Sequence, residues 1–334
     1  MSTPKDRRQA TADRQLLARR WRLRWAAAVA GLCASVALSG CSALSGLGIG
    51  PTPTPVPPLY RYDTAIATAE AGADREAQAA AYYARAGAHF EQGDYAAAIE
   101  DYGRAIELDP ANARAHNDRA LAHQALGQFE QALADFDAAT RIDPAYTRAY
   151  KNRVALLEVT GGDPERLAAD YGRLAELEPA AAAAHRYRQG VVLHGLRDFA
   201  AARAAYDAAL AADPQHVDAL YERALLSYAE GRLQDAIADL DRAIRLSPRA
   251  ANAYYARALA RSARGDRSGA LDDLTAALAL DPDNPEALLA RAAIALDAGD
   301  REQAAADLAR LELLAPDDQL AAAADALRQK LRAP

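Results

Sequence analysis

The stretch from Ala111 to Pro144, ANARAHNDRALAHQALGQFEQALADFDAATRIDP, holds two segments with helical apolar spacing, separated by Gly127 and closed by the proline. Glycine after a periodic segment marks a turn, and proline beyond the second segment marks a stop. The stretch is therefore predicted to form two antiparallel helices joined by a tight turn.

The same pattern recurs along the chain at a nearly constant interval. The closing prolines follow one another at spacings of 34 or 35 residues. They are Pro110, Pro144, Pro179, Pro214, Pro248, Pro282 and Pro316. Six of the units have a turn glycine: Gly93, Gly127, Gly161, Gly231, Gly265 and Gly299. Such a period is typical of a solenoid, in which each hairpin buries its apolar face against its neighbours.

Alanines flank a large side chain in the second segment of most units. The sets are Ala98/Tyr102/Ala105, Ala132/Phe136/Ala139, Ala202/Tyr206/Ala209, Ala236/Leu240/Ala243 and Ala270/Leu274/Ala277. Small residues at this spacing let two helices approach closely, while the large side chain fills the space between them. An apolar residue two positions before the proline is expected to complete the buried stripe: Leu108, Ile142, Leu177, Leu246, Leu280 and Leu314.

From Ala79 to Pro316 the chain resembles the tetratricopeptide repeat family in its period, turn glycine, alanines, aromatic residue and closing proline. The resemblance implies an all-α fold, a right-handed superhelical solenoid of about seven helical hairpins with terminal capping helices. We expect an N-terminal capping helix in 61–78, seven repeats in 79–316 and a C-terminal capping helix in 317–334. Extra residues at Gly161-Gly162 and in 180–184 predict local splay there, without a break in the repeat.

Six units also share a pair of opposite charges placed symmetrically about the turn. The arginines are Arg85, Arg119, Arg153, Arg223, Arg257 and Arg291, and the aspartates are Asp101, Asp135, Asp170, Asp239, Asp273 and Asp307. Positions equally spaced from a turn lie opposite one another in an antiparallel hairpin, so we expect ion pairs that serve the architecture. The fourth unit has Gln189 and Ala205 at these places, and both charges are thus absent together.

Residues 1–40 are predicted to be a secretory signal peptide, because a basic stretch precedes an apolar run that ends in small residues. Leu38-Ser39-Gly40-Cys41 resembles the lipobox of bacterial lipoproteins. The resemblance implies a lipid on Cys41 and a location outside the cytoplasm, on the outer face of the cell membrane or on the outer membrane. An uncleaved anchor over 25–49 is the alternative, and export by the Sec or the twin-arginine route stays open. The proline-rich residues 41–60 are expected to form an extended tether.

Charge and motif content narrow the functional classes. Beyond residue 40 the chain has 31 Lys and Arg against 44 Asp and Glu, which argues against a nucleic-acid ligand. We find no nucleophile elbow, phosphate-binding loop or zinc-protease motif, and the six histidines lack the spacing of metal ligands. The sequence therefore predicts no enzyme activity, no metal site and no cofactor.

The resemblance further implies that the first helices of successive repeats line a concave groove for a protein or peptide partner. Mapped onto this sequence, the partner-binding residues are Tyr83, Arg114, Asn117, Arg148, Lys151, Asn152, Tyr187, Arg188, Tyr221, Glu222 and Tyr255. Four of them, Arg114, Arg148, Lys151 and Arg188, are expected to form a basic cluster.

These features together predict a non-catalytic interaction scaffold, anchored to a membrane, that assists assembly of an envelope, pilus or secretion complex. The alternative is a lipoprotein that captures a glycan or small molecule on its tyrosine row, because stacked aromatic rings suit sugars as well as peptides.

Overall fold

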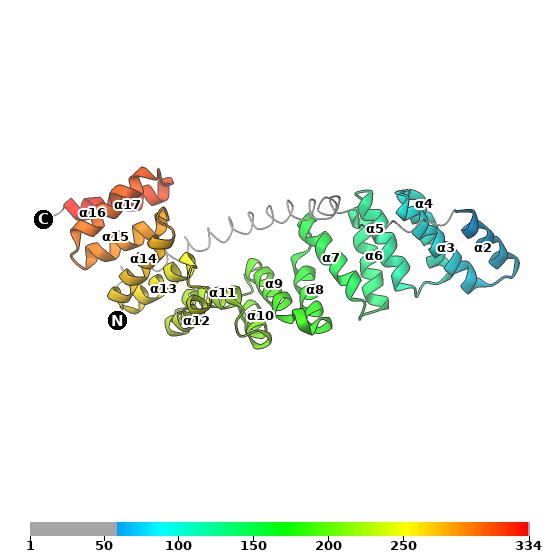
Figure 1. Cartoon of the computed structure of the whole chain (residues 1–334), viewed down its shortest axis with the longest axis horizontal. Helices are drawn as coiled ribbons and strands as arrows, with labels where there is room; N and C mark the ends of the chain where they lie inside the picture. Colours follow the sequence, from blue (N-terminus) through cyan, green and yellow to red (C-terminus); the bar gives the residue numbers. More distant parts are fainter. Residues whose placement is uncertain (1–58, 333–334) are drawn as a thin grey trace, which may run out of the picture. The chain divides into compact units, whose positions relative to one another are not determined.

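The structure is a computed structural model that describes residues 59–332. Within this range the chain forms helices and turns and no strand, which confirms the predicted all-α fold of helical hairpins (Figure 1). The first helices of the hairpins are α3 (Arg75–Glu91), α5 (Ala113–Ala125), α7 (Thr147–Thr160), α9 (Ala182–Gly195), α11 (Val217–Ala229), α13 (Ala251–Arg264) and α15 (Pro285–Asp297). The second helices are α4 (Tyr95–Leu108), α6 (Phe129–Ile142), α8 (Pro164–Leu177), α10 (Phe199–Ala212), α12 (Leu233–Leu246), α14 (Arg267–Leu280) and α16 (Arg301–Leu313).

Short polar side chains determine where most of the helices begin. In each capping residue, which directly precedes a helix, a side-chain oxygen accepts a hydrogen bond from a backbone N–H of the first turn of that helix. They are Asp74, Asp94, Asn112, Asp163, Asp198, Asp266, Asn284 and Asp300. Because Asp74 caps α3, the first helix of the first repeat starts at Arg75, ahead of the boundary predicted at Ala79.

The turns inside the hairpins need a left-handed residue. All six predicted turn glycines have a positive φ, between 63° and 91°. Glycine takes this conformation without the steric cost that other residues meet. In the fourth hairpin, Arg197 occupies the turn position with a φ of 65°.

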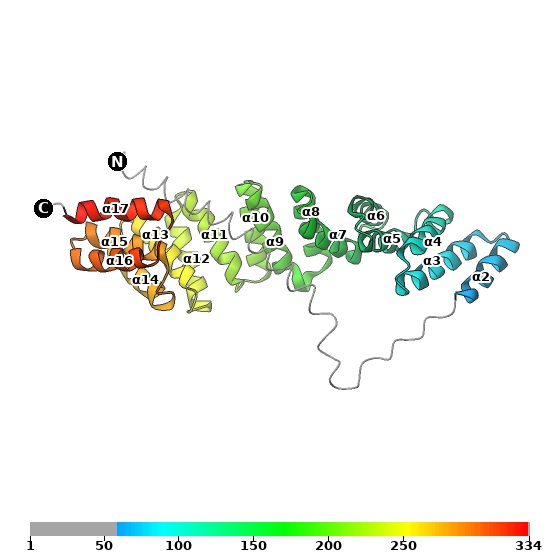
Figure 2. The same ribbon diagram turned by 90° about the horizontal axis from the view of Figure 1, so that it is seen from above.

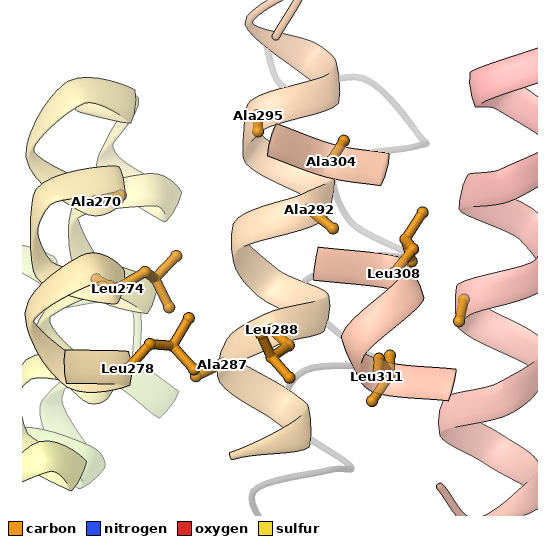
Figure 3. Packing of buried hydrophobic residues seen from close by; sticks show 12 residues of the cluster. Ala270, Leu274, Leu278, Ala287, Leu288, Ala292, Ala295, Ala304, Leu308 and Leu311 are labelled. Atoms are coloured by element: carbon orange, nitrogen blue, oxygen red, sulfur yellow. The ribbon is translucent and has the colours of Figure 1, made fainter. Parts of the chain in front are cut away.

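The predicted alternation of small and large residues forms the core. Ala98, Ala132, Ala202, Ala236 and Ala270 are fully buried, and each of the large residues that they flank is at most 4% exposed. Figure 3 shows this packing near the C-terminus, where Leu278 of α14 points towards Ala287 of α15. The expectation for the residue two positions before the proline is wrong, because none of the six is buried, and Leu108, Ile142, Leu177 and Leu314 are half-buried. Leu246 and Leu280 are each 40% exposed, because they end their helices beyond the closely packed crossing.

A further helix lies at each end of the described region. Helix α2 (Tyr60–Ala71) packs on α3 and buries Ile66 and Ala69, while Asp63 accepts a hydrogen bond from Arg85 at 2.6 Å. Helix α17 (Asp318–Arg332) lies against α15 and α16 and buries Leu320 and Ala324 (Figure 2). In residues 59–332 we find no helix with the length and hydropathy needed to cross a bilayer.

The described residues divide into two compact units, 59–181 and 182–332, which we call the N-terminal and C-terminal units. The first three hairpins belong to the N-terminal unit and the last four to the C-terminal unit. The boundary falls at the extra residues of 180–184, where we expected splay, and a short 3-10 helix, η1 (Pro179–Ala181), precedes it. Helical hairpins lie on both sides of this boundary in the sequence, and the described residues nevertheless form two compact units.

Candidate functional site

All six predicted arginine–aspartate pairs are present. In each pair the arginine Nε and Nη2 donate to the two carboxylate oxygens, over distances between 2.5 and 2.9 Å. The six aspartates are buried, with exposures between 2% and 6%. A bidentate ion pair of this kind joins the two helices and also fixes the angle between them.

Most of these arginines also contact the element before their own hairpin. The Nη1 of Arg153 donates to Asp137 at 2.7 Å, and that of Arg223 donates to Asp207 at 2.7 Å. Arg257 makes the same contact with Asp241 at 2.6 Å. One side chain thus clamps its hairpin and links it to the preceding one, which confirms the structural role.

In the second repeat, the surroundings of Asp135 hold this carboxylate in its charged form. Burial acts to raise the pKa of Asp135, but hydrogen bonds from Arg119 and His116 outweigh it and hold the pKa below its ordinary value. The guanidiniums of Arg85 and Arg223 likewise have raised pKa values, because each donates to the carboxylate of its own hairpin and to a second one.

The predicted groove residues of the N-terminal unit form a polar row across the first helices. Tyr83 of α3 donates its hydroxyl hydrogen to Asp118 of α5 at 2.5 Å, and Asn117 donates to the same carboxylate at 2.8 Å. Asn152 of α7 donates to the side-chain oxygen of Asn117 at 2.9 Å. Asn117 is fully buried, so it joins neighbouring repeats and is not accessible to a partner.

The four residues of the expected basic cluster belong to different units and differ in their partners. Lys151 forms an ion pair with Glu178 at 2.5 Å, which neutralises its charge, and Arg188 belongs to the C-terminal unit. Arg114 and Arg148 are exposed and belong to the N-terminal unit. The sequence suggested four cations on one surface because spacing alone does not reveal the partner of Lys151.

One residue of this surface was missed by the sequence analysis. Tyr146 lies just before α7, and burial and the charge of Asp118 raise the pKa of its phenol, while Arg148 and Arg114 act to lower it. The charges of Asp118, Arg148 and Arg114 therefore all act on the Tyr146 phenol. The available signal was an aromatic residue at the start of a first helix.

The predicted residues of the C-terminal unit are Tyr187, Arg188, Tyr221, Glu222 and Tyr255. Tyr187 lies against His216, with ring centroids 4.9 Å apart, and against the buried Tyr206 at 6.2 Å. Arg188 is exposed, whereas Tyr221, Glu222 and Tyr255 are half-buried. One edge of the Tyr187 ring thus takes part in the packing of the fourth hairpin.

The remaining predictions concern the lipid anchor and a metal site. Cys41 and the signal peptide lie outside the described residues. Within 59–332, no group of three His, Cys, Asp or Glu side chains has an arrangement suited to a metal ion. His89, His116 and His123 lie beside the aspartates of the clamps.

Comparison with known proteins agrees with this architecture. A family model described as TPR repeat matches residues 87–127, and two described as Tetratricopeptide repeat match residues 113–146 and 187–251. The sequence matches none of the curated proteins compared with it.

Several solved structures are similar in fold. The C-terminal part of a TPR repeat-containing protein from Cytophaga hutchinsonii has a TM-score of 0.53 at 16% identity, covering 72% of this chain and 98% of that one. YrrB, a TPR protein with an unusual peptide-binding site, has a TM-score of 0.46 at 22% identity, covering 58% and 98%. PilW, a type IV pilus biogenesis factor, has a TM-score of 0.38 at 22% identity, covering 61% and 94%. The recurring hairpins, their turn glycines and the matching family models together show that the chain belongs to the tetratricopeptide repeat family.

Proposed function

We propose that the protein is a non-catalytic interaction scaffold that binds a protein or peptide partner through the first helices of its repeats. The supporting observation is that two sets of polar residues have different roles. The arginine–aspartate pairs recur from hairpin to hairpin and are used inside the fold, whereas the first-helix residues differ between repeats and several are exposed. First-helix residues that the fold does not use, and that lie on the same face of successive repeats, are suited to recognising a partner.

The proposal includes a membrane anchor. A lipid on Cys41 would hold the repeats outside the cytoplasm, and the proline-rich residues 41–60 would separate them from the bilayer. The sequence from Leu38 to Cys41 supports this placement. An anchored scaffold of this kind suits the assembly of an envelope, pilus or secretion complex, and the acidic repeats do not suit nucleic acid.

Mass spectrometry of the protein from the native membrane tests the anchor. We expect a mature N-terminus at Cys41 with an attached lipid, and Cys41→Ala should abolish the lipid and leave the precursor uncut at this site. An intact wild-type chain that begins at Met1 would rule out the lipid anchor at Cys41.

Site-specific photo-crosslinking in intact cells tests the scaffold. Probes on exposed first-helix positions, Ala84 and Asn252, should capture a defined protein partner. Matched probes on exposed second-helix positions, Ala134 and Arg245, should capture none. Equal capture from both helices, or no captured protein from either, would contradict binding through the first-helix face.

A further inference from the structure

Arg114 and Arg148 have the same place in successive repeats of the N-terminal unit. Each is the second residue of a first helix, α5 or α7, and each is exposed. Within residues 59–332, neither guanidinium makes a hydrogen bond or an ion pair. This sets them apart from the arginines of the clamps, which are all used by the fold.

These two positions are also electrostatically unfavourable for a cation. The N-terminal turn of a helix carries a partial positive charge, so acidic residues stabilise it and basic residues oppose it. Neither α5 nor α7 has an acidic residue in its first turn to offset the arginine. The fold therefore gains nothing at these helix ends from Arg114 and Arg148.

The C-terminal unit shows what the repeat accepts at the same place. The second residues of α11, α13 and α15 are Asp218, Asn252 and Glu286, and two of the three are acids that favour the helix end. A cation is thus not a requirement of the repeat. Its presence in two adjacent repeats of one unit calls for a reason outside the stability of the helices.

The surroundings of the arginine pair suit an acidic ligand. Asp118 of α5 accepts hydrogen bonds from Tyr83 and Asn117, so its charge is partly offset by these two neighbours. Tyr146 lies just before α7, and the charges of Arg148 and Arg114 act to lower the pKa of its phenol. Two unpaired guanidiniums on neighbouring first helices can bind carboxylates through charge-assisted hydrogen bonds.

We propose that Arg114 and Arg148 bind two carboxylates of an acidic, extended segment of a partner protein, which rests on the proposed function and names the chemistry of the partner. The hydrogen bond from Asn152 to Asn117 shows that α5 and α7 are direct neighbours. Neighbouring helices pack at roughly 8–10 Å, and an extended chain rises about 3.3 Å per residue. Acidic residues spaced about two to four positions apart therefore reach both arginines.

Binding of synthetic peptides to the full chain, measured by fluorescence anisotropy, tests this proposal. The probe is a short labelled peptide with Glu at alternate positions, and its reference has Gln at the same positions. We expect the Glu peptide to bind at least about tenfold more tightly than the Gln peptide at low salt, with the preference shrinking as salt rises. The double variant Arg114→Glu/Arg148→Glu should lose this preference.

A control with the same change in charge is available. Arg141 and Arg245 are exposed arginines in the last turns of the second helices α6 and α12. Arg141→Glu/Arg245→Glu should keep the preference for the Glu peptide. The two double variants should also differ in stability with opposite signs. Reversal at the helix starts should raise the thermal midpoint by about 1–4 °C, and reversal at the helix ends should lower it. Loss of binding by a more stable protein cannot be attributed to unfolding.

Three outcomes would overturn the proposal. Equal binding of the Glu and Gln peptides, equal loss of preference in both double variants, or equally tight binding of a short single-stranded DNA would each contradict an acidic peptide ligand at Arg114 and Arg148. If crosslinking in cells still captures a protein on the first helices, only the acidic chemistry fails. If it captures none, the scaffold itself fails.

Discussion

The fourth and fifth hairpins belong to the same unit and differ at three places that the fold uses. The fifth hairpin has Arg223 clamped to Asp239, a glycine turn at Gly231 and an alanine at its crossing, Ala224. At the corresponding positions the fourth hairpin has Gln189, Ala205, Arg197 and Gly190.

In the fourth hairpin an aromatic ring packs directly against the glycine of the first helix. An added Cβ on Gly190 would lie 2.5 Å from the Tyr206 ring, so the missing side chain is what lets this ring pack against α9. Tyr206 is fully buried, as is Ala202 beside it. The comparison shows that a hairpin of this repeat can form without the ion pair when both charges are absent. The pair is therefore part of the architecture.

The largest expected effect comes from breaking the clamp of the fifth hairpin on one side only. Arg223→Ala leaves the carboxylate of Asp239 buried without its partner, which should cost about 2–4 kcal/mol of unfolding free energy. Gln189→Ala at the equivalent place should cost less than about 0.5 kcal/mol. Urea unfolding gives the totals, and hydrogen exchange of α11 and α12 locates the loss. Similar costs for the two variants would contradict a structural role for the pair.

The crossing of the fourth hairpin offers a second test. Gly190→Ala places a methyl group against the Tyr206 ring and should destabilise the protein by about 1–3 kcal/mol. The matched change Gly103→Ala in α4 meets nothing closer than Arg119 Nη1 at 3.7 Å, and should stabilise it by about 0.5–1 kcal/mol. Both are measured by urea unfolding. A tolerated Gly190→Ala would show that Tyr206 does not hold the hairpin.

The same two hairpins should differ in their response to acid. Burial lowers the pKa of His194 in the fourth hairpin to about 4, and the fifth has Tyr228 at the equivalent position. The unfolded chain, with a histidine pKa near 6.5, binds the proton first, so stability falls as the pH drops from about 6.5 towards 4.

Changing the pH from 7 to 5 should therefore cost the wild type about 1–2 kcal/mol more than it costs His194→Tyr. Unfolding curves of both proteins at the two pH values provide the measurement. Parallel losses would mean that His194 is as accessible to protons in the folded state as in the unfolded one.

The turns give the smallest expected difference. Arg197 has a φ of 65°, which strains a residue with a side chain, so Arg197→Gly should stabilise the fourth hairpin by about 0.5–1 kcal/mol. Gly231→Ala, with a φ of 77° at that position, should destabilise the fifth by about 1 kcal/mol. Thermal midpoints that shift in these opposite directions would support the comparison, and a loss in both would not.

Much of the fold could be predicted because the structure of each hairpin is determined by residues within that hairpin. The turn glycines Gly93 and Gly231, and pairs such as Arg119 with Asp135, follow from spacing within one repeat. The link from Arg223 to Asp207 was not predictable in this way, because it depends on how consecutive hairpins cross. Splay was expected near Ala181, but the division into two compact units there was not, since an insertion of one residue does not specify where a unit ends.

The candidate site was only partly predictable for the same reason. The sequence placed Tyr83, Asn117 and Asn152 on the first helices, but their hydrogen bonds across repeats and the burial of Asn117 depend on the contact between α3, α5 and α7. Lys151 was expected to be a free cation, and Glu178, at the other end of its hairpin, pairs with it. Arg114 and Arg148 remain as the two unpaired cations of the predicted four in the N-terminal unit.

The separation between residues that build the repeats and residues that bind a partner is tested most directly by exchanging the second residues of the first helices between the units. Arg114→Asp, Arg148→Asn, Asp218→Arg and Asn252→Arg together keep the composition and the net charge, and all four positions are exposed. The measurement is crosslinking of a Glu-containing peptide with a photoreactive group, mapped by mass spectrometry on both proteins. We predict that the exchanged protein stays folded and that the crosslinks leave α5 and α7. Crosslinks that stay on α5 and α7 after the exchange would contradict the assignment of the binding role to Arg114 and Arg148.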